Sequence, residues 1–535
     1  MPEQDSNPQQ TIFQAASLLA PTGMEIAAVA ARAPERPAIV SEYGNRSFWE
    51  LNARANQVAL LLRSAGLKAG DPVALLCGNR PEFIEVVMAA HRLGLRLTPV
   101  NWHLKAEEIA YIVNDCEALA LFADIRIGEA AQQAIAGNSR LRMKLAIGGD
   151  IAGFAGYAQS GLDLTTSDID APVRGSVMQY TSGTTGKPKG VLRKQPDPAK
   201  AADMQQLITA VFQFEPDSGK DCGLVTGPLY HAGPFNLCMQ TPLTAGIGIV
   251  MMDRWEPEQT LELIQQHSIT HSFFVPTMFT RMLQLSDEIR ANYDLTSLRF
   301  VIHGAAPCAR STKQQMMDWF GPIIWEMFAG TEGAGTFVSP QEWLAKPGTV
   351  GKPGPEQIRI LDDEGTSMAA GEEGQIWIVN PVDSQFEYFK SPEKTAAAQR
   401  DGYFTAGDIG YFDDDGYLFL TGRSAETIIS GGVNIYPQEI DDILSKHDAV
   451  ADVACVGVPN IEWGEEVKAL VQLSDSVSAS DALAAELIAH CEQHLAKQKI
   501  PRSVEFLDLI PRSEAGKVYR RALRDRYWQN QASKI

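Results

Sequence analysis

The sequence predicts an α/β fold with a large N-terminal domain of α/β subdomains plus a β-rich subdomain, followed by a small α+β C-terminal domain. Two observations predict it. Apolar strand-like runs alternate with helical patterns over the first part of the chain, and from about Gly348 short strands are separated by Gly, Asp and Asn turns. We expect the boundary near residue 422, which gives domains of residues 1–421 and 422–535.

The N-terminal part reads as β-α-β units. Ser47 and Glu50 have the spacing of a capping box and predict a helix start. A strand over residues 73–77 is followed by a helix that begins at Pro81, and Gly94 is expected to cap that helix before the next strand. Further strands are expected at residues 95–100, 119–122, 224–226, 247–251, 272–274 and 300–302.

The C-terminal part has a different pattern. A strand at residues 375–379 and a turn at 413–416 belong to the β-rich subdomain. After Gly422 we expect a compact unit that ends in a basic tail. Its predicted elements are helices at residues 437–446 and 481–496 and strands at 450–456, 467–473 and 504–506.

Composition excludes several classes of protein. The 535 residues are 45% hydrophobic and carry 46 Lys and Arg against 66 Asp and Glu, a net charge of −20, which disfavours a nucleic-acid partner. Seven cysteines without a CxxC pair argue against a disulfide framework or a zinc ribbon. The N-terminus lacks a signal-peptide pattern, and the longest apolar stretch, residues 245–252, is too short for a transmembrane segment. We therefore expect a cytoplasmic protein.

A glycine-rich segment at residues 180–190 is the sharpest functional signal. It contains four Ser or Thr, three Gly and two Lys. Glycines let backbone N–H groups approach a phosphate, hydroxyls donate further hydrogen bonds and ammonium groups offset its charge. An ordinary polar loop is the alternative. The segment is not a Walker A loop, because Pro188 follows Gly186-Lys187.

Several later motifs occur in a fixed order after this loop. They are Pro228–His231, Gly304–Pro307, Phe328–Glu332, Tyr403–Asp408, Gly422–Arg423, Gly431–Pro437 and Pro511–Lys517. With the loop, they resemble the adenylate-forming superfamily of acyl-CoA synthetases, peptide-synthetase adenylation domains and firefly luciferases. The resemblance covers almost the whole chain and is strongest to acyl-CoA synthetases, including the fatty-acid and steroid-acid branches.

The resemblance implies an ATP-dependent carboxylate–CoA ligase of lipid and fatty acid metabolism. Such an enzyme forms an acyl-adenylate and then an acyl-CoA thioester, releasing pyrophosphate and AMP. ATP, coenzyme A and a small-molecule carboxylic acid would be substrates, Mg²⁺ would be the metal, and the C-terminal domain would be mobile. The acid would be a medium- or long-chain fatty acid or a bulky steroid-like acid, and a homodimer is compatible with the sequence.

The same resemblance implies roles for particular residues. Lys517, Glu332, Thr184 and His231 would be catalytic, with Thr184 and Glu332 at the metal. Asp408 would bind the ribose, and Arg423 the ribose or a phosphate. His231 would be a gate between the carboxylate and ATP sites, with a core histidine as the alternative. The phosphates would bind Thr181, Ser182, Gly183, Thr184, Thr185, Gly186, Lys187 and Lys189. The adenine and acyl sites would include Gly304, Ala305, Ala306, Pro307, Phe328, Ala329, Gly330 and Thr331. Ser430, Gly431, Gly432 and Asn434 would face CoA.

Four positions depart from the superfamily pattern. Phe328 replaces the commoner Tyr, so that stacking on adenine is kept but the phenolic hydroxyl is lost. Ala329 replaces Gly, Ala406 replaces Thr, and Ala425 stands at the hinge where Asp or Lys is usual. In the synthetases that this chain resembles, the residue after Ala329 lines the acyl tunnel. Here it is Gly330, so the resemblance implies an open tunnel with residues 234–235 and 275–278 as apolar wall. The alternative is that Gly330 serves backbone geometry alone.

Two other functions remain open from the sequence. One is a stand-alone adenylating enzyme that loads a carrier-protein thiol. The other is a nonenzymatic nucleotide-binding module, which the retained Glu332, Asp408, Arg423 and Lys517 disfavour. The first alternative predicts that a carrier protein accepts the activated acid, and the second predicts that no acid is activated.

Overall fold

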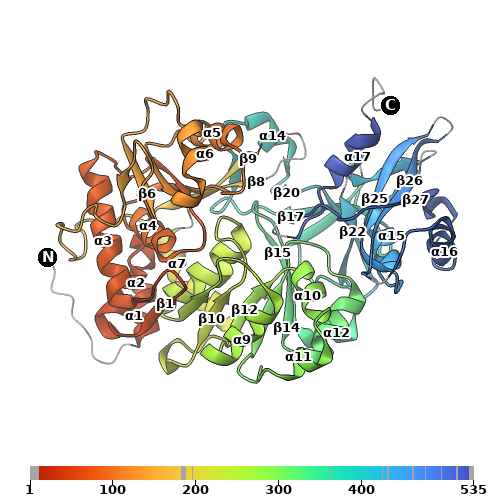
Figure 1. Cartoon of the computed structure of the whole chain (residues 1–535), viewed down its shortest axis with the longest axis horizontal. Helices are drawn as coiled ribbons and strands as arrows, with labels where there is room; N and C mark the ends of the chain where they lie inside the picture. The colour runs from red at the N-terminus through yellow and green to blue at the C-terminus, as the bar shows by residue number, and fades with distance from the viewer. Residues whose placement is uncertain are drawn as a thin grey trace. The chain divides into compact units, whose positions relative to one another are not determined.

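The computed structural model describes residues 11–181, 188–195, 197–362, 364–423, 426–430, 433–460, 463–475, 477–495, 497–513 and 516–528 (Figure 1). The chain forms two compact units. The first comprises Met1–Phe274, Leu285–Ile302 and Pro381–Thr395, and the second Val275–Gln284, His303–Asn380 and Ala396–Ile535. Both units combine sheets with helices, so the α/β expectation is confirmed.

One sheet of the first unit has the strand order β18-β9-β8-β4-β3-β5-β6-β7. Its central strands β4, β3, β5 and β6 are parallel, as the β-α-β pattern predicts. The strands are β3 (Pro72–Leu76), β4 (Arg96–Pro99), β5 (Ala120–Asp124), β6 (Met143–Ile147), β7 (Ala155–Gly156), β8 (Ser176–Thr181), β9 (Lys189–Arg193) and β18 (Phe386–Tyr388). The helices in this part of the chain are α3 (Phe48–Ser64), α4 (Pro81–Arg92), α5 (Ala106–Asp115) and α6 (Gly128–Ala134).

A second sheet of this unit contains the order β13-β12-β10-β11-β1-β2. Its strands are β1 (Pro37–Val40), β2 (Arg46–Ser47), β10 (Cys222–Val225), β11 (Gly248–Met251), β12 (His271–Phe274) and β13 (Phe300–His303). The helices of this part are α1 (Ile12–Leu19), α2 (Glu25–Arg32), α7 (Pro198–Val211), a π-helix η4 (Pro234–Gln240), α8 (Thr241–Thr244), α9 (Pro257–His267) and α11 (Asp287–Ala291).

The second unit begins its site-bearing region with a β-hairpin. Strands β14 (Ile324–Ala329) and β15 (Ala334–Val338) are antiparallel. Helices α10 (Pro276–Leu283), α12 (Arg310–Phe320) and α13 (Pro340–Ala345) belong to the same unit. An antiparallel sheet follows, made of β16 (Ile358–Leu361), β17 (Gly374–Val379), β19 (Gln399–Arg400), β20 (Tyr403–Phe404), β21 (Asp408–Phe412) and β22 (Leu418–Arg423), with α14 (Pro392–Ala397) between β18 and β19.

The C-terminal part of the second unit is a five-stranded sheet with helices. Its elements are β23 (Ile428–Ser430), β24 (Val433–Ile435), α15 (Pro437–Leu444), β25 (Val450–Asn460), β26 (Gly464–Leu473), α16 (Asp481–Glu492), β27 (Ser503–Phe506) and α17 (Arg520–Trp528). Val453, Cys455 and Val467 of the sheet pack with Ile440 of α15 and Leu487 of α16 in one buried core. This is the α+β pattern expected after Gly422.

Local sequence signals are confirmed in several places. Ser47 accepts a hydrogen bond from the Glu50 N–H at 3.2 Å, and the Glu50 side chain accepts one from the Ser47 N–H at 2.8 Å. The turn at 413–416 closes through a 2.9 Å bond from Gly416 N–H to the Asp413 carbonyl. Helix α16 ends at Glu492 rather than residue 496, and much of the expected basic tail forms α17.

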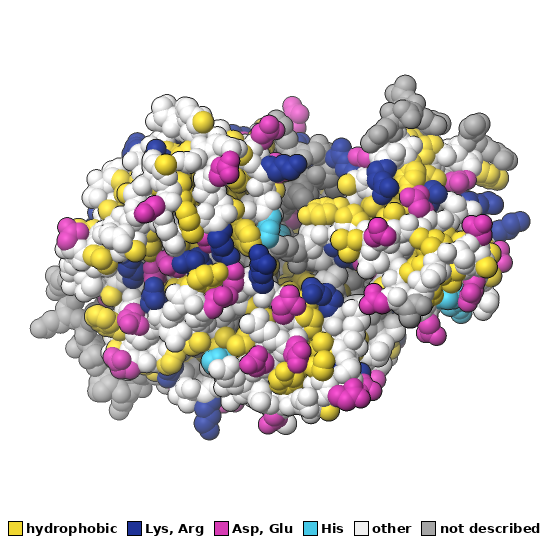
Figure 2. Space-filling view, in the orientation of Figure 1, with side chains coloured by type: hydrophobic (Ala, Val, Ile, Leu, Met, Phe, Trp, Pro, Cys, Tyr) yellow, Lys and Arg dark blue, Asp and Glu magenta, His cyan; other side chains and the backbone are white. Residues whose placement is uncertain are grey.

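Two surface properties follow from the same sequence. Among the described residues, every helix is too short or too polar to cross a membrane. On the face shown in Figure 2, the described Lys and Arg side chains lie among Asp and Glu side chains rather than in one continuous basic field.

Candidate active site

The two ends of the glycine-rich loop are held by an antiparallel strand pair in the first unit. Thr181 of β8 pairs with Lys189 of β9. Tyr111 of α5 donates a hydrogen bond to the Pro188 carbonyl at 3.2 Å, and the Lys189 ammonium lies 4.8 Å from the centre of the Tyr388 ring. The expected phosphate ligands Ser182, Gly183, Thr184, Thr185, Gly186 and Lys187 lie outside the described residues.

The segment around His231 follows β10 in the first unit. The His231 N–H donates to the Pro228 carbonyl at 3.1 Å, and the His231 ring lies 4.4 Å from that of Tyr230. Buried Asn79 organises this turn, because its amide donates to the Gly227 and Met252 carbonyls and its Oδ1 accepts from the Leu229 N–H. Asn79 was not predicted as a site residue; the available signal was a polar residue two positions after the apolar strand 73–77.

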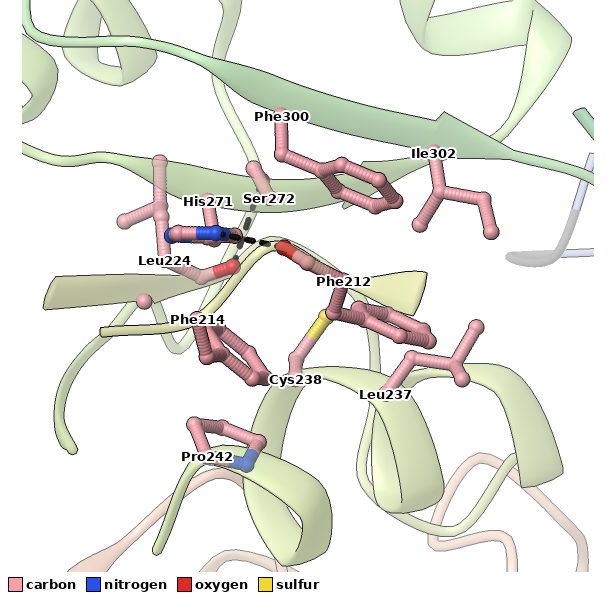
Figure 3. A pocket seen from close by; sticks show the side chains of 11 residues that line it. Phe212, Phe214, Leu224, Leu237, Cys238, Pro242, His271, Ser272, Phe300 and Ile302 are labelled. Carbon is pink, nitrogen blue, oxygen red and sulfur yellow. Dashed lines mark hydrogen bonds between the residues drawn. The ribbon is translucent and has the colours of Figure 1, made fainter. Parts of the chain in front are cut away.

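A small apolar cavity lies beside the π-helix that begins at Pro234. Figure 3 shows aromatic rings from Phe212, Phe214 and Phe300 around it, with Leu237 and Cys238 of the π-helix on the facing wall. His271 of β12 completes the wall, and its Nε2 bonds the Phe212 carbonyl at 2.9 Å. Burial lowers the pKa of His271 to about 3, so the imidazole is neutral at pH 7. Phe235 instead packs edge-on against Phe83.

Asp408 and Arg423 face each other in the second unit. They are cross-strand partners at the ends of β21 and β22, and Arg423 Nε donates to Asp408 Oδ1 at 2.9 Å. The Asp408 side chain is 13% exposed and that of Arg423 43%. The Asp408 charge raises the pKa of Arg423 and outweighs the desolvation that lowers it. This pair offers one carboxylate and one permanent positive charge to a polar ligand.

The turn before Asp408 is supported by a hydroxyl. Gly407 has a positive φ of 85° and its N–H donates to Thr405 Oγ1 at 3.0 Å. Thr405 is buried and its own N–H donates to the Ala398 carbonyl at 2.9 Å. The hydroxyl that supports this turn therefore belongs to Thr405, the residue before Ala406.

The Phe328–Glu332 motif lies at the end of β14 and in the turn to β15. The turn closes through a 2.8 Å bond from the Gly330 N–H to the Gly333 carbonyl. Phe328 pairs with Thr336, and a Cβ at Gly335 would lie 2.7 Å from the Phe328 ring, so a glycine is needed beside it. Glu332 is half-buried in this turn.

The Gly304–Pro307 segment follows β13 and lies against β14. A Cβ at Gly304 would come within 2.7 Å of the Met327 carbonyl oxygen, so glycine permits this close approach. Ala305 has a φ of 69°, in the left-handed region that costs a non-glycine residue about 1 kcal/mol or more. Ala305 and Pro307 are exposed, while Gly304 is buried.

Lys517 lies in a turn that its neighbours hold closed. The Ser513 N–H donates to the Lys517 carbonyl at 2.7 Å, and the Lys517 N–H donates to Ser513 Oγ at 3.1 Å. Arg512 donates to the Gly516 carbonyl at 2.8 Å and forms a two-pronged ion pair with Asp452 at 2.7 Å. The sequence analysis missed this anchor, because 60 residues separate Arg512 from Asp452.

Electrostatics connects Lys517 with three of the expected site residues. Desolvation, followed by the Arg423 charge, lowers the pKa of Lys517, whereas Asp408, Glu332 and Glu426 act in the opposite direction. All of these groups belong to the second unit. Lys517 therefore interacts electrostatically with Glu332, Asp408 and Arg423, a group of four charged residues that we call the electrostatic cluster.

Gly516 provides a direct test of the Lys517 turn. It has a φ of 75°, and a Cβ there would lie 2.7 Å from the Thr277 hydroxyl of α10. We expect Gly516→Ala to slow the adenylation half-reaction by about tenfold or more, because strain and this clash displace Lys517. Gly371→Ala is the matched control, since Gly371 also has positive φ and meets no atom within 4 Å. Equal rates in the two variants, measured by pyrophosphate exchange, would contradict this role.

The residues expected to face CoA are only partly described. Ser430 ends β23 and pairs with Val433 and Gly464, and the Asn434 backbone pairs with Ile429. Gly431 and Gly432 lie outside the described residues, as does the expected hinge Ala425. The roles of these residues stay predictions.

The chemistry of Glu332 fits a magnesium ion held mainly by phosphate oxygens. Among the described residues there is no group of three His, Cys, Asp or Glu side chains that could hold a metal. Mg²⁺ is commonly held by one or two carboxylates together with substrate phosphates and water. A single half-buried carboxylate beside Arg423 and Lys517 suits that arrangement.

Comparison with known proteins decides the family. A family model described as "AMP-binding enzyme" matches residues 26–384, and "AMP-binding enzyme C-terminal domain" matches residues 439–517. The chain belongs to the AMP-binding enzyme family. The resemblance to adenylate-forming enzymes is thereby confirmed, and the expected enzyme class and the expected use of ATP, CoA and Mg²⁺ are confirmed at the level of the family.

Three similar proteins illustrate the relationship. A fatty acid–[acyl-carrier-protein] ligase of Streptomyces coeruleorubidus is 31% identical, covering 94% of this chain and 95% of the relative. A 2-succinylbenzoate–CoA ligase of Geobacillus kaustophilus is 32% identical, covering 92% and 95%. The solved o-succinylbenzoate CoA synthetase of Bacillus subtilis, in complex with its acyl-adenylate intermediate, has a TM-score of 0.79 at 26% identity and covers 93% and 97%.

Proposed function

We propose that this protein is a carboxylate–CoA ligase that activates an apolar carboxylic acid with ATP. The carrying observation is the cluster of Lys517, Glu332, Asp408 and Arg423 in the second unit. Lys517 and Arg423 supply two positive charges. Asp408 supplies a carboxylate suited to hydroxyl groups, and Glu332 one suited to a hard cation. These are the groups that transfer of a nucleotidyl group needs, since the protein contributes positioning and charge stabilisation rather than covalent chemistry.

In the first half-reaction, a carboxylate oxygen of the acid attacks the α-phosphorus of ATP. The new bond joins oxygen to phosphorus, the bond from the α-phosphorus to the bridging oxygen breaks, and pyrophosphate leaves. Lys517 would offset the negative charge that develops on the α-phosphate. Asp408 would accept hydrogen bonds from the ribose hydroxyls, and Phe328 would stack on adenine against the Gly304–Pro307 segment. Bound Mg²⁺ at Glu332 would neutralise phosphate charge.

In the second half-reaction, the CoA thiolate attacks the acyl carbon of the adenylate. The carbon–sulfur bond forms, the carbon–oxygen bond to phosphate breaks, and AMP leaves. We place the boundary of the mobile C-terminal domain between residues 421 and 422, with the hinge at Ala425. Its rotation would withdraw Lys517 and present the segment from Ser430 to Asn434 to CoA. His231 would gate the passage between the acid and the nucleotide.

The acid is proposed to be a medium- or long-chain fatty acid or a bulky steroid-like acid. Gly330 provides no side chain that could close the acyl site. Each buried methylene contributes about 0.8 kcal/mol, so a long chain gains several kcal/mol over acetate. With this substrate the protein belongs to cytoplasmic lipid and fatty acid metabolism; a homodimer is part of the same proposal.

The test is an acid panel. ATP, Mg²⁺ and acetate, octanoate, palmitate, a cinnamate or a bile-type acid are incubated with and without CoA, and AMP and acyl-CoA are quantified. The proposal expects AMP with octanoate or a larger acid and acyl-CoA only when CoA is present. A preference for acetate would overturn the assigned acid class, and ADP formation would overturn the mechanism.

A carrier-protein acceptor is the second candidate. It is favoured by the similarity to a fatty acid–[acyl-carrier-protein] ligase over 94% of this chain. The two acceptors are separated by supplying CoA or a phosphopantetheinylated carrier protein to preformed acyl-adenylate. Faster transfer to the carrier protein would make that protein the proposed acceptor in place of CoA. Faster transfer to CoA would keep CoA as the proposed acceptor.

Substitution at Gly330 tests the size of the acyl site. We expect Gly330→Leu to lower kcat/KM for long acids relative to short ones. The ratio is expected to change by about tenfold for every few methylenes that no longer fit. A Cβ at Gly330 would lie 3.1 Å from Glu332 Oε2, so kcat for every acid is expected to fall as well. Gly330→Ala controls for that common loss. An unchanged ratio between palmitate and acetate in Gly330→Leu would assign Gly330 to backbone geometry alone.

A further inference from the structure

Three ionisable side chains lie buried together in the second unit, outside the cluster around Lys517. Lys313 of α12 donates to Glu326 Oε2 at 2.7 Å, and His303 Nε2 lies 3.3 Å from the same oxygen. Their side chains are 1%, 11% and 0% exposed for Lys313, Glu326 and His303. The mechanism above uses none of them.

Aromatic rings surround this group and restrict its geometry. The Lys313 ammonium lies 4.8 Å from the centre of the Trp343 ring, and the Phe279 ring meets His303 edge-on at 5.4 Å. Neither ring nitrogen of His303 has a well-directed hydrogen-bond partner among the described residues. Leaving a buried polar group in this condition lowers the stability of the fold, a loss that an apolar side chain would avoid.

Two of the three residues, His303 and Glu326, are close in sequence to segments of the proposed adenine site. His303 is the residue before Gly304, whose backbone approaches Met327. Glu326 is two residues before Phe328 on β14, and residues two apart on a strand share a face. Glu326 thus connects the strand that carries Phe328 with the residue that leads into the adenine segment.

The adenine segment also contains a strained residue. Ala305 has a φ of 69°, and such a conformation persists only where the surrounding structure fixes it. His303 ends β13 two residues before Ala305. The residue whose Nε2 lies 3.3 Å from Glu326 Oε2 is therefore only two positions from the strained one.

Burial and charge act in opposite directions on this group. Burial would raise the pKa of Glu326, but His303 and Lys313 outweigh it and lower that pKa to about 2. Burial lowers the pKa of His303, against the opposing effect of Glu326. Burial also lowers the pKa of Lys313, and Glu326 opposes that shift.

We propose that His303, Lys313 and Glu326 form a positioning network that holds the Gly304–Pro307 segment against β14 and thereby sets the affinity for the adenine of ATP. The inference rests on the proposed function and deepens it, since it names residues that act on ATP binding through others. A buried ion pair is weak support for stability alone, because apolar residues of similar volume are often as stable. We therefore assign these buried charges a role in positioning the Gly304–Pro307 segment rather than in stability.

The test compares Glu326→Gln with Arg174→Gln. Arg174 forms an ion pair with Glu25 at 2.6 Å in the first unit, so Arg174→Gln serves as a control that removes one largely buried ion pair. Four quantities are measured for each protein: the Kd for ATP by titration calorimetry, the KM for ATP and for the acid, kcat of pyrophosphate exchange, and the melting temperature. Glu326→Gln is expected to raise Kd and KM for ATP about tenfold, with the KM for the acid and kcat changed less than threefold.

Arg174→Gln is expected to lower the melting temperature without changing the Kd for ATP. Wild-type ATP affinity in folded Glu326→Gln, or an equal loss in Arg174→Gln, would overturn the network. If Glu326→Gln does not fold, the double variant Lys313→Met/Glu326→Leu leaves no buried charge unpaired and keeps the test. It is expected to fold and still bind ATP about tenfold more weakly, and wild-type affinity there would overturn the proposal. A wild-type protein that does not bind ATP would refute the proposed function itself.

Discussion

Lys517→Ala is expected to slow acyl-adenylate formation by about 100- to 1,000-fold, because it removes the positive charge proposed to act on the α-phosphate. Thioester formation from supplied acyl-adenylate and CoA is expected to change less than threefold, since Lys517 would be withdrawn in that step. Rapid-quench measurement of each half-reaction checks both expectations. Lys346→Ala is the control, because Lys346 lies in the same unit and pairs with Asp413 and Asp415.

The pH dependence of the same step gives a second readout of Lys517. Desolvation by the surrounding protein and the Arg423 charge lower the pKa of Lys517, so the ammonium loses its proton at a lower pH than an ordinary lysine. Adenylation is therefore expected to fall on the alkaline side before pH reaches about 10.4, the usual lysine pKa. Thioester formation is expected to keep its rate there. An equal loss of both half-reactions, in folded Lys517→Ala or at alkaline pH, would contradict the assigned role.

Asp408→Ala is expected to raise the KM for ATP by about 10- to 100-fold, because hydrogen bonds to a charged group contribute about 1.5–3 kcal/mol each. The substitution also leaves Arg423 without its 2.9 Å partner. The sharpest measurement compares ATP with 2′,3′-dideoxy-ATP in both proteins, as a double-mutant cycle between carboxylate and hydroxyls.

Wild type is expected to prefer ATP, and Asp408→Ala is expected to treat the two nucleotides alike. Asp413→Ala is the control, since Asp413 lies in the turn between β21 and β22 and pairs with Lys346 instead. A preference for ATP that survives in Asp408→Ala would move the ribose contact to another residue.

Much of the fold could be predicted because its signals are local. Pro81 begins α4, and Gly94 follows the helix with a φ of 71°, as the capping rules require. Helix α17 was missed because its arginine-rich sequence reads as a solvated tail, although Leu523 packs with Ile510 and Val456 in a small core. The π-helix at Pro234–Gln240 was also missed, since its hydrogen-bond pattern has no signature in helical periodicity.

Residues of the site could be predicted where they belong to one contiguous sequence motif. Asp408 and Arg423 come together because β21 and β22 are adjacent and antiparallel, which a hairpin pattern indicates. The contacts that hold the site are formed by residues far apart in sequence, such as Arg512 with Asp452 and Asn79 with Gly227. A single sequence contains no signal that pairs such positions, so only the folded chain shows them.

The transfer of a heavy oxygen isotope tests the central claim most directly. The proposed acid is labelled with heavy oxygen in its carboxylate and converted with ATP and CoA, and the AMP is analysed by mass spectrometry. Attack of the carboxylate on the α-phosphorus predicts one labelled oxygen in AMP and none in pyrophosphate. Unlabelled AMP, or label in a released phosphate together with ADP, would contradict adenylation.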